Sequence, residues 1–109
     1  MAVTSPQELF SQQLPTRFKE KPELAEKINA VYKFVVTGDN GGTWLVDLTK
    51  AGGEITEGDG EAACTITVGG DDLVSIVNGK LNAQMAFMSG KLKVAGDMGL
   101  AMKLSSIFG

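Results

Sequence analysis

Hydrophobic and polar residues follow two periods along this chain, and the periods predict where strands and helices lie. Alternation of apolar and polar positions predicts strands, because every second side chain points to the same face of a sheet. It is clearest where Tyr32, Phe34 and Val36 share one face. Five strands are predicted, at residues 31–37, 43–49, 54–57, 63–68 and 91–95. Short turns rich in glycine separate the first four, so they are expected to follow one another as a meander.

Apolar positions three and four residues apart predict helices before and after the strands. The first helix is expected to begin at Ser5, because Pro6 and Glu8 follow it in the pattern of a capping box. Pro15 is expected to break or kink it at Leu14, since proline lacks an amide hydrogen and its ring crowds the preceding turn. Beyond Pro15, helical segments are predicted at residues 16–20, 23–29, 71–78, 82–89 and 98–107, with Asp71 or Asp72, Asn82 and Asp97 at their starts and Gly79 and Gly90 at their ends.

A sheet that is apolar on one face needs a cover, and the predicted helices can supply it. The pattern therefore indicates an α+β fold, with a mostly antiparallel five-stranded sheet covered by helices on one face. The 109 residues are expected to form one domain, residues 1–109, with a small core.

The composition excludes several kinds of active site, because the chain contains no histidine. Nucleophile pairs that use an imidazole base, and most zinc sites, are thereby excluded. No pair of carboxylates has a recognisable acid/base spacing, so neither an enzyme nor a metal or other cofactor is expected. Cys64 lies mid-strand on the apolar face and is expected to be a packed core thiol.

Targeting signals are not evident in the sequence. The first ten residues lack a basic cluster followed by an apolar block, and a single cysteine cannot form an internal disulfide. A cytoplasmic location is the resulting expectation.

Charge is distributed unevenly, although the net charge is only −3. An acidic chain of this kind argues against nucleic-acid binding, which depends on a basic surface. Residues 1–38 carry +1, residues 39–79 carry −7 and residues 80–109 carry +3. The positive segment overlaps residues 79–109, which hold four of the five methionines. Methionine side chains adapt to differently shaped apolar partners, but they also fill ordinary cores.

Residues 79–104 read GKLNAQMAFMSGKLKVAGDMGLAMKL, and residues 41–55 read GGTWLVDLTKAGGEI. Together with ACTITV at residues 63–68, these segments resemble the sterol carrier protein type two family, in register from about Tyr32 to Leu104. The resemblance implies a hydrophobic tunnel enclosed between helices and sheet. It also implies binding of fatty acids, fatty acyl-CoA or sterols with little selectivity and without catalysis.

The resemblance favours a tunnel lining over an ordinary core for the apolar residues of the sheet and the later helices. Gln84 is the polar residue expected near a ligand head group, although a plain surface position fits it equally well. Phe10 and Phe108 are placed near an opening. The full predicted set of ligand-contacting residues is Phe10, Trp44, Val46, Ile66, Leu73, Ile76, Val77, Gln84, Met85, Met88, Leu100, Met102, Leu104 and Phe108.

Two further hypotheses concern partners. Lys80, Lys91, Lys93 and Lys103 are expected to bring the opening into transient contact with anionic membranes, or to hold the phosphates of acyl-CoA. The alternative function is a lipid-free interaction module whose apolar last helix packs on a partner protein. Animal members of the family commonly end in a peroxisomal tripeptide of the Ser-Lys-Leu kind, whereas this sequence ends in Ser106, Ile107, Phe108 and Gly109. Import by that route is therefore not expected.

Overall fold

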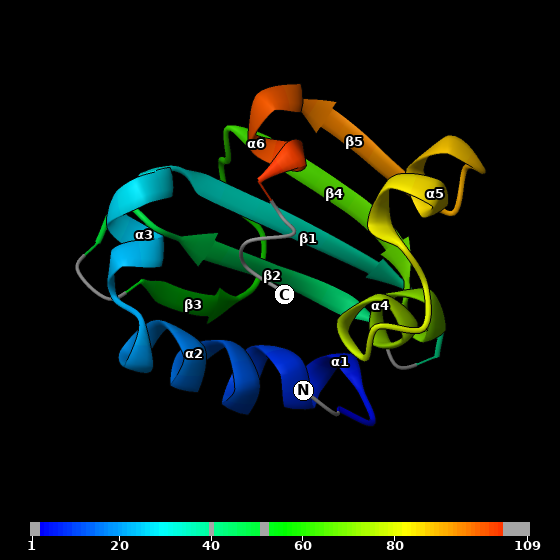
Figure 1. Ribbon diagram of the computed structural model, residues 1–109, viewed down its shortest axis with the longest axis horizontal. Helices are drawn as coiled ribbons and strands as arrows, with labels where there is room; N and C mark the ends of the chain where they lie inside the picture. The colour runs from blue at the N-terminus through cyan, green and yellow to red at the C-terminus, as the bar shows by residue number, and fades with distance from the viewer. Residues whose placement is uncertain (1–2, 40, 51–52, 104–109) are drawn as a thin grey trace.

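The computed structural model describes residues 3–39, 41–50 and 53–103 (Figure 1). In chain order the elements are α1 (Pro6–Glu8), the π-helical segment η1 (Leu9–Gln13), α2 (Leu14–Glu20), α3 (Glu23–Ile28), β1 (Val31–Thr37), β2 (Gly42–Asp47), β3 (Glu54–Glu57), β4 (Cys64–Gly69), α4 (Gly70–Val77), α5 (Ala83–Met88), β5 (Leu92–Gly96) and α6 (Met98–Met102). The predicted strands are all present, within two residues of their expected ends. The predicted α+β fold is confirmed.

The first helix is not broken at Pro15. Ser5 caps it as expected, its hydroxyl oxygen accepting a hydrogen bond from the Glu8 amide at 3.2 Å. From α1 the chain passes through η1 into α2 without interruption, and the Leu14 amide bonds to the Leu9 carbonyl five residues back. The wider π turns end directly before Pro15, which has no amide hydrogen to place in the ladder. The helix therefore changes its hydrogen-bond spacing instead of ending.

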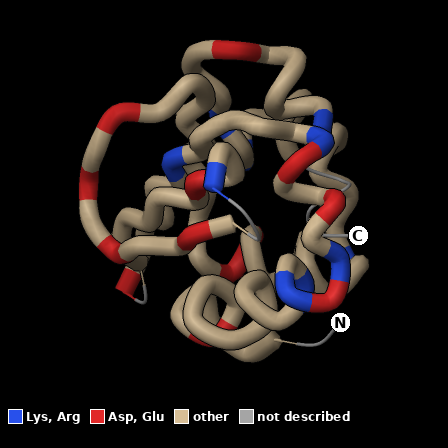
Figure 2. The backbone as a smooth tube through the Cα atoms, turned by 90° about the vertical axis from the view of Figure 1, so that its left-hand side faces the viewer, with Lys and Arg blue, Asp and Glu red and all other residues tan. Residues whose placement is uncertain are grey.

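The sheet has the strand order β3-β2-β1-β4-β5. Three of its four pairings are antiparallel, as expected, but β1 and β4 are parallel, so the predicted meander is wrong. After β3 the chain crosses the outer face of β2 and β1 to reach β4. Lys33 on β1 forms an ion pair with Asp59 of this connection at 3.0 Å, and the Ala63 amide bonds to the Val31 carbonyl at 3.0 Å. Figure 2 shows acidic positions along the segment that bulges from the left-hand side of the view.

The helices stand around the inner face of the sheet (Figure 1): α1 and α2 run along the β3 side, α3 lies at one end, α4 and α5 lie at the other, and α6 lies near β5. The inner positions of β1, Tyr32, Phe34 and Val36, are buried, whereas the outer positions are half-buried. Buried side chains from the sheet and the helices form one core cluster on this face.

Helix ends follow the predictions with one exception. Asn82 and Asp97 cap α5 and α6 through their side-chain oxygens. Gly79 and Gly90 have φ angles of +80° and +83°, which favour glycine. The expected cap of α4 at Asp71 or Asp72 is wrong, because Gly69 at the end of β4 is still extended and both carboxylates lie in the first helical turn. Of the predicted helix at residues 98–107, the part from residue 104 onward lies outside the described residues.

Candidate functional site

Three aromatic side chains from three elements meet on the inner face of the sheet. The ring of Phe10, from η1, stacks on Trp44 of β2 with centroids 4.6 Å apart and meets Phe34 of β1 at 5.3 Å. Phe10 is 1% exposed and Trp44 is 5% exposed. Offset aromatic pairs of this kind prefer such separations and bury a large apolar area. They provide a flat, rigid apolar wall on the η1 side of the inner face.

Helix α6 is held over the same face by a buried hydrogen bond. The Tyr32 hydroxyl, on β1, donates to the Leu100 carbonyl of α6 at 2.6 Å. Burial raises the pKa of the Tyr32 phenol, and the neighbouring Cys64 and Asp97 raise it further, so the hydroxyl keeps its proton and remains a donor. Leu100 is itself buried against the core. A bond between residues 68 positions apart had no signal in the sequence.

Most of the predicted ligand-contacting residues come together in this one cluster. Eight of them are buried on the inner face and belong to the same core: Phe10, Trp44, Val46, Ile66, Leu73, Ile76, Val77 and Leu100. They come from five elements: η1, β2, β4, α4 and α6. Leu104 and Phe108 lie outside the described residues.

The predicted methionines lie elsewhere. Met85, Met88 and Met102 are 66%, 78% and 81% exposed, and Gln84 is exposed beside them on α5. In α5 the buried residue is Ala86, and the helix ends in a turn in which the Lys91 amide bonds to the Ala86 carbonyl at 2.9 Å. These side chains therefore stand outside the core cluster, and their contact with a ligand stays a prediction.

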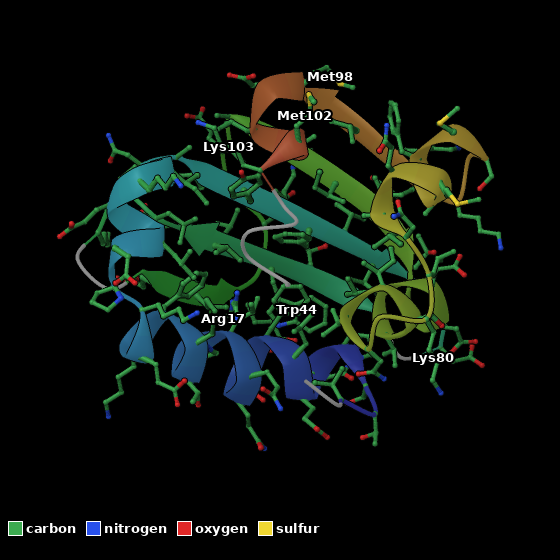
Figure 3. All side chains as sticks on the ribbon, in the orientation of Figure 1. Arg17, Trp44, Lys80, Met98, Met102 and Lys103 are labelled. Atoms are coloured by element: carbon green, nitrogen blue, oxygen red, sulfur yellow. The ribbon has the colours of Figure 1, made fainter. Side chains whose placement is uncertain are left out.

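Arg17 was missed by the sequence reasoning. It lies on α2 between the buried Leu14 and Phe18, and its Nε atom is excluded from solvent. Figure 3 shows its side chain reaching from α2 toward the sheet. A guanidinium keeps its charge at any ordinary pH and matches a carboxylate with two parallel hydrogen bonds. The signal in the sequence was weak: an arginine one residue before an apolar helix position.

The remaining polar features are a surface hollow and a buried thiol. A surface hollow of about 530 Å³ is lined by Thr37, Gly38, Asp39 and residues 69–72, and its side chains are mostly acidic. Cys64 is buried, as expected, and burial raises the pKa of its thiol. Within the described ranges, no group of three or more histidine, cysteine, aspartate or glutamate side chains could hold a metal ion. No helix described here is long and apolar enough to cross a bilayer.

Known proteins share both this sequence and this fold. Residues 11–109 match the SCP-2 sterol transfer family. Sterol carrier protein 2 of Rattus norvegicus is 44% identical over 93 residues, which cover 82% of this chain and 17% of that protein. Peroxisomal multifunctional enzyme A of Dictyostelium discoideum is 47% identical over 88 residues, or 78% of this chain and 20% of that enzyme. The chain thus spans about a fifth of the length of these relatives.

Solved structures agree with the sequence matches. The sterol carrier protein domain 2 of Helicoverpa armigera superimposes with a TM-score of 0.77 at 34% identity, over 98% of this chain and 91% of that one. A sterol carrier protein 2 of Aedes aegypti in complex with palmitate has a TM-score of 0.75 at 27% identity, over 94% and 92% of the two chains. The fold is that of a lipid-carrier domain. The chain belongs to the SCP-2 sterol transfer family, whose members bind and transfer lipids.

Proposed function

We propose that residues 1–109 act as one carrier domain that binds the acyl chain of a fatty acid or fatty acyl-CoA, or a sterol, against the inner face of the sheet. The observation that supports this most is the joining of eight predicted residues from five elements in one apolar cluster. The palmitate complex of the Aedes aegypti relative supports a fatty acid as one of these ligands.

The energy of burial is sufficient for such a ligand. Each methylene group removed from water contributes about 0.8 kcal/mol, so a sixteen-carbon chain gains on the order of 13 kcal/mol. Association and ordering offset about 4 to 10 kcal/mol or more of this gain. A dissociation constant in the micromolar range is expected, since an offset of about 5 kcal/mol leaves about 8 kcal/mol, which corresponds to about 1 μM. Because apolar walls discriminate only weakly between ligand shapes, several lipids should bind with similar affinity.

We assign the carboxylate end of a fatty acid to Arg17, in place of the predicted Gln84. The Nε atom of Arg17, on α2, is excluded from solvent, whereas Gln84 is exposed on α5. A carboxylate at this position would gain a charge-assisted bond while its chain lies against Phe10 and Trp44. Sterols and acyl-CoA would not use this bond in the same way.

No chemical step is part of the proposal. An imidazole base is missing from the sequence, and Cys64 is buried with its pKa raised, which disfavours the reactive thiolate. Transfer of lipid also requires contact with a membrane, and transient contact with an anionic surface belongs to the proposal. No cofactor is needed for any of these steps.

Displacement of a fluorescent fatty acid tests the proposal. Saturable displacement by palmitate is expected, with Arg17→Gln weakening palmitate on the order of tenfold while leaving the matching fatty alcohol unchanged. Lys19→Gln, an exposed position on the same helix, is the matched control and should bind like the wild type. If the folded wild type binds no lipid and is a dimer, the lipid-free interaction module would replace the carrier.

A further inference from the structure

The row of aromatic rings on the inner face continues to Tyr32, which ends in a polar atom. The Tyr32 ring lies 6.1 Å from Phe34, and Phe34 meets Phe10 at 5.3 Å. Tyr32 is fully buried, and its hydroxyl donates to the Leu100 carbonyl of α6 at 2.6 Å. Figure 3 shows α2, with Arg17, and α6 on opposite sides of the inner face. A lipid lying along the rings would therefore have a polar side chain at each end.

The Tyr32 oxygen can accept a hydrogen bond in addition to the one that its hydroxyl donates. A phenol has one donor and can also accept. The donor is used by the Leu100 carbonyl, which takes a second bond from the Lys103 amide at 3.1 Å and so has both lone pairs filled. Among the described residues none donates to the Tyr32 oxygen. A buried acceptor in apolar surroundings is stabilised by a ligand group that can donate to it.

The surroundings of this hydroxyl disfavour a carboxylate. The pKa of the Tyr32 phenol is raised first by burial and then by the nearby Cys64 and Asp97, so a negative charge is unfavourable at this place. A carboxylate has no proton to donate, and its charge would lie buried near Asp97. A neutral hydroxyl group has a donor and no charge. At the opposite side of the face, the guanidinium of Arg17 favours an anion, so the two ends differ in electrostatic sign.

From the available acceptor and the difference between the two ends, we propose that the Tyr32 hydroxyl binds the hydroxyl group of a neutral lipid, a sterol or a long-chain alcohol. The ligand hydroxyl donates to the Tyr32 oxygen while Tyr32 keeps its bond to Leu100, so that ligand, β1 and α6 form one chain of hydrogen bonds. A fatty acid uses Arg17 and lies with its head group at the opposite end. This rests on the proposed carrier function and names the class of lipid that each end selects.

Displacement of a fluorescent fatty acid by hexadecanol and by its methyl ether tests the assignment. The two competitors share one alkyl chain, but only the alcohol can donate a hydrogen bond. In Tyr32→Phe, the affinity for hexadecanol relative to the ether should fall on the order of fivefold, because one neutral hydrogen bond is lost. Cholesterol should lose as much relative to cholesteryl methyl ether. Palmitate, which Arg17 holds, should lose much less than hexadecanol.

The wild type gives a second test that needs no variant, because the chain has one tyrosine. The intensity ratio of the tyrosine Raman doublet reports whether a phenol donates a hydrogen bond, accepts one or does both. Saturation with hexadecanol should move the ratio from that of a donor to that of a donor and acceptor. The methyl ether and palmitate should leave it as it is in the free protein. An unchanged ratio in the hexadecanol complex would overturn the assignment.

Leu100→Ala is the matched control, because it weakens the packing of α6 but keeps the Leu100 carbonyl and the Tyr32 hydroxyl. It should lower the affinities for alcohol, ether and palmitate by similar factors. If Tyr32→Phe also lowers all three equally, Tyr32 acts only by holding α6, and the assignment is wrong. Palmitate binding without binding of hexadecanol or cholesterol would likewise contradict this assignment alone. Failure of the wild type to bind any of these lipids would contradict the carrier function itself.

Discussion

Two regions of the molecule are rich in large apolar residues: the inner face of the sheet, and residues 80–103 with α5, β5 and α6, called the β5 edge. Water reaches only the second. On the inner face Phe10, Phe34 and Trp44 are at most 5% exposed, whereas Met88 and Met102 on the β5 edge are about four-fifths exposed. The inner face lies over the central strands, with helices standing around it. The β5 edge lies beside a strand that has a neighbour on one side only. Position in the sheet, rather than residue type, separates the buried apolar residues from the exposed ones.

The largest difference between the regions should appear when one apolar side chain is removed from each. Phe10→Ala is expected to lower the free energy of unfolding by about 3–5 kcal/mol, because a buried aromatic pair is lost and a cavity is left. Met88→Ala should change it by about 0.5 kcal/mol or less, since the side chain is exposed. Urea unfolding followed by Trp44 fluorescence measures both. Equal losses would show that the two regions do not differ in packing.

The attachment of the β5 edge to the sheet can be tested at Gly96. Gly96 has φ of +98°, and an added Cβ would meet the Ala63 carbonyl oxygen in the neighbouring backbone. Gly96→Ala is expected to cost about 3 kcal/mol, and Gly90→Ala about 1 kcal/mol, because Gly90 shares the left-handed φ but has open space around it. Thermal unfolding of both variants makes the comparison. Similar melting temperatures would mean that the close approach to Ala63 has no energetic role.

Tyr32→Phe should loosen the link between the inner face and α6. The variant leaves the Leu100 carbonyl without its buried donor, which costs about 1–2 kcal/mol. Amide hydrogen exchange is expected to accelerate in α6 and to stay unchanged in α5, which the hydroxyl does not touch. Unaltered exchange in α6 would contradict the role of Tyr32 in holding that helix.

Alkaline pH should weaken the inner face by a smaller amount. Burial raises the pKa of both Cys64 and Tyr32 above their unfolded values, so the folded state retains these protons longer. Their contribution is complete below the unfolded pKa values, about 8.5 and 10, and is lost as the pH rises above them. Between about pH 8 and 9.5 the loss from Cys64 is at most about 1 kcal/mol. Cys64→Val should remove this part of the pH dependence, and an unchanged profile in that variant would show that the thiol is not responsible.

Local patterns predicted much of the inner face. The alternation around Tyr32 and Trp44 identified the buried strand faces, and Asp97 was recognised as the cap of the last helix. The parallel pairing of β1 with β4 could not be predicted, because it depends on where the connection after β3 crosses the sheet. Contacts made along that crossing, such as Lys33 with Asp59, join residues that are distant in sequence.

The exposure of the methionines could not be predicted from the sequence either. In α5, Met85 and Met88 are three residues apart, and so are Ala83 and Ala86, so both pairs fit a helical stripe. The structure turns the alanines inward: Ala86 is buried and Ala83 half-buried, whereas both methionines are exposed. Arg17 was missed for a related reason: a single charge beside apolar positions carries no spacing signal.

Quenching of Trp44 by a spin-labelled fatty acid tests the central claim most directly. The chain has one tryptophan, and it lies stacked on Phe10 at the proposed acyl wall. With the label midway along the acyl chain, quenching should saturate at one ligand per protein, with a dissociation constant in the micromolar range, and unlabelled palmitate should reverse it. Trp44 fluorescence that remains unquenched in the folded protein at saturating ligand would contradict binding against the inner face.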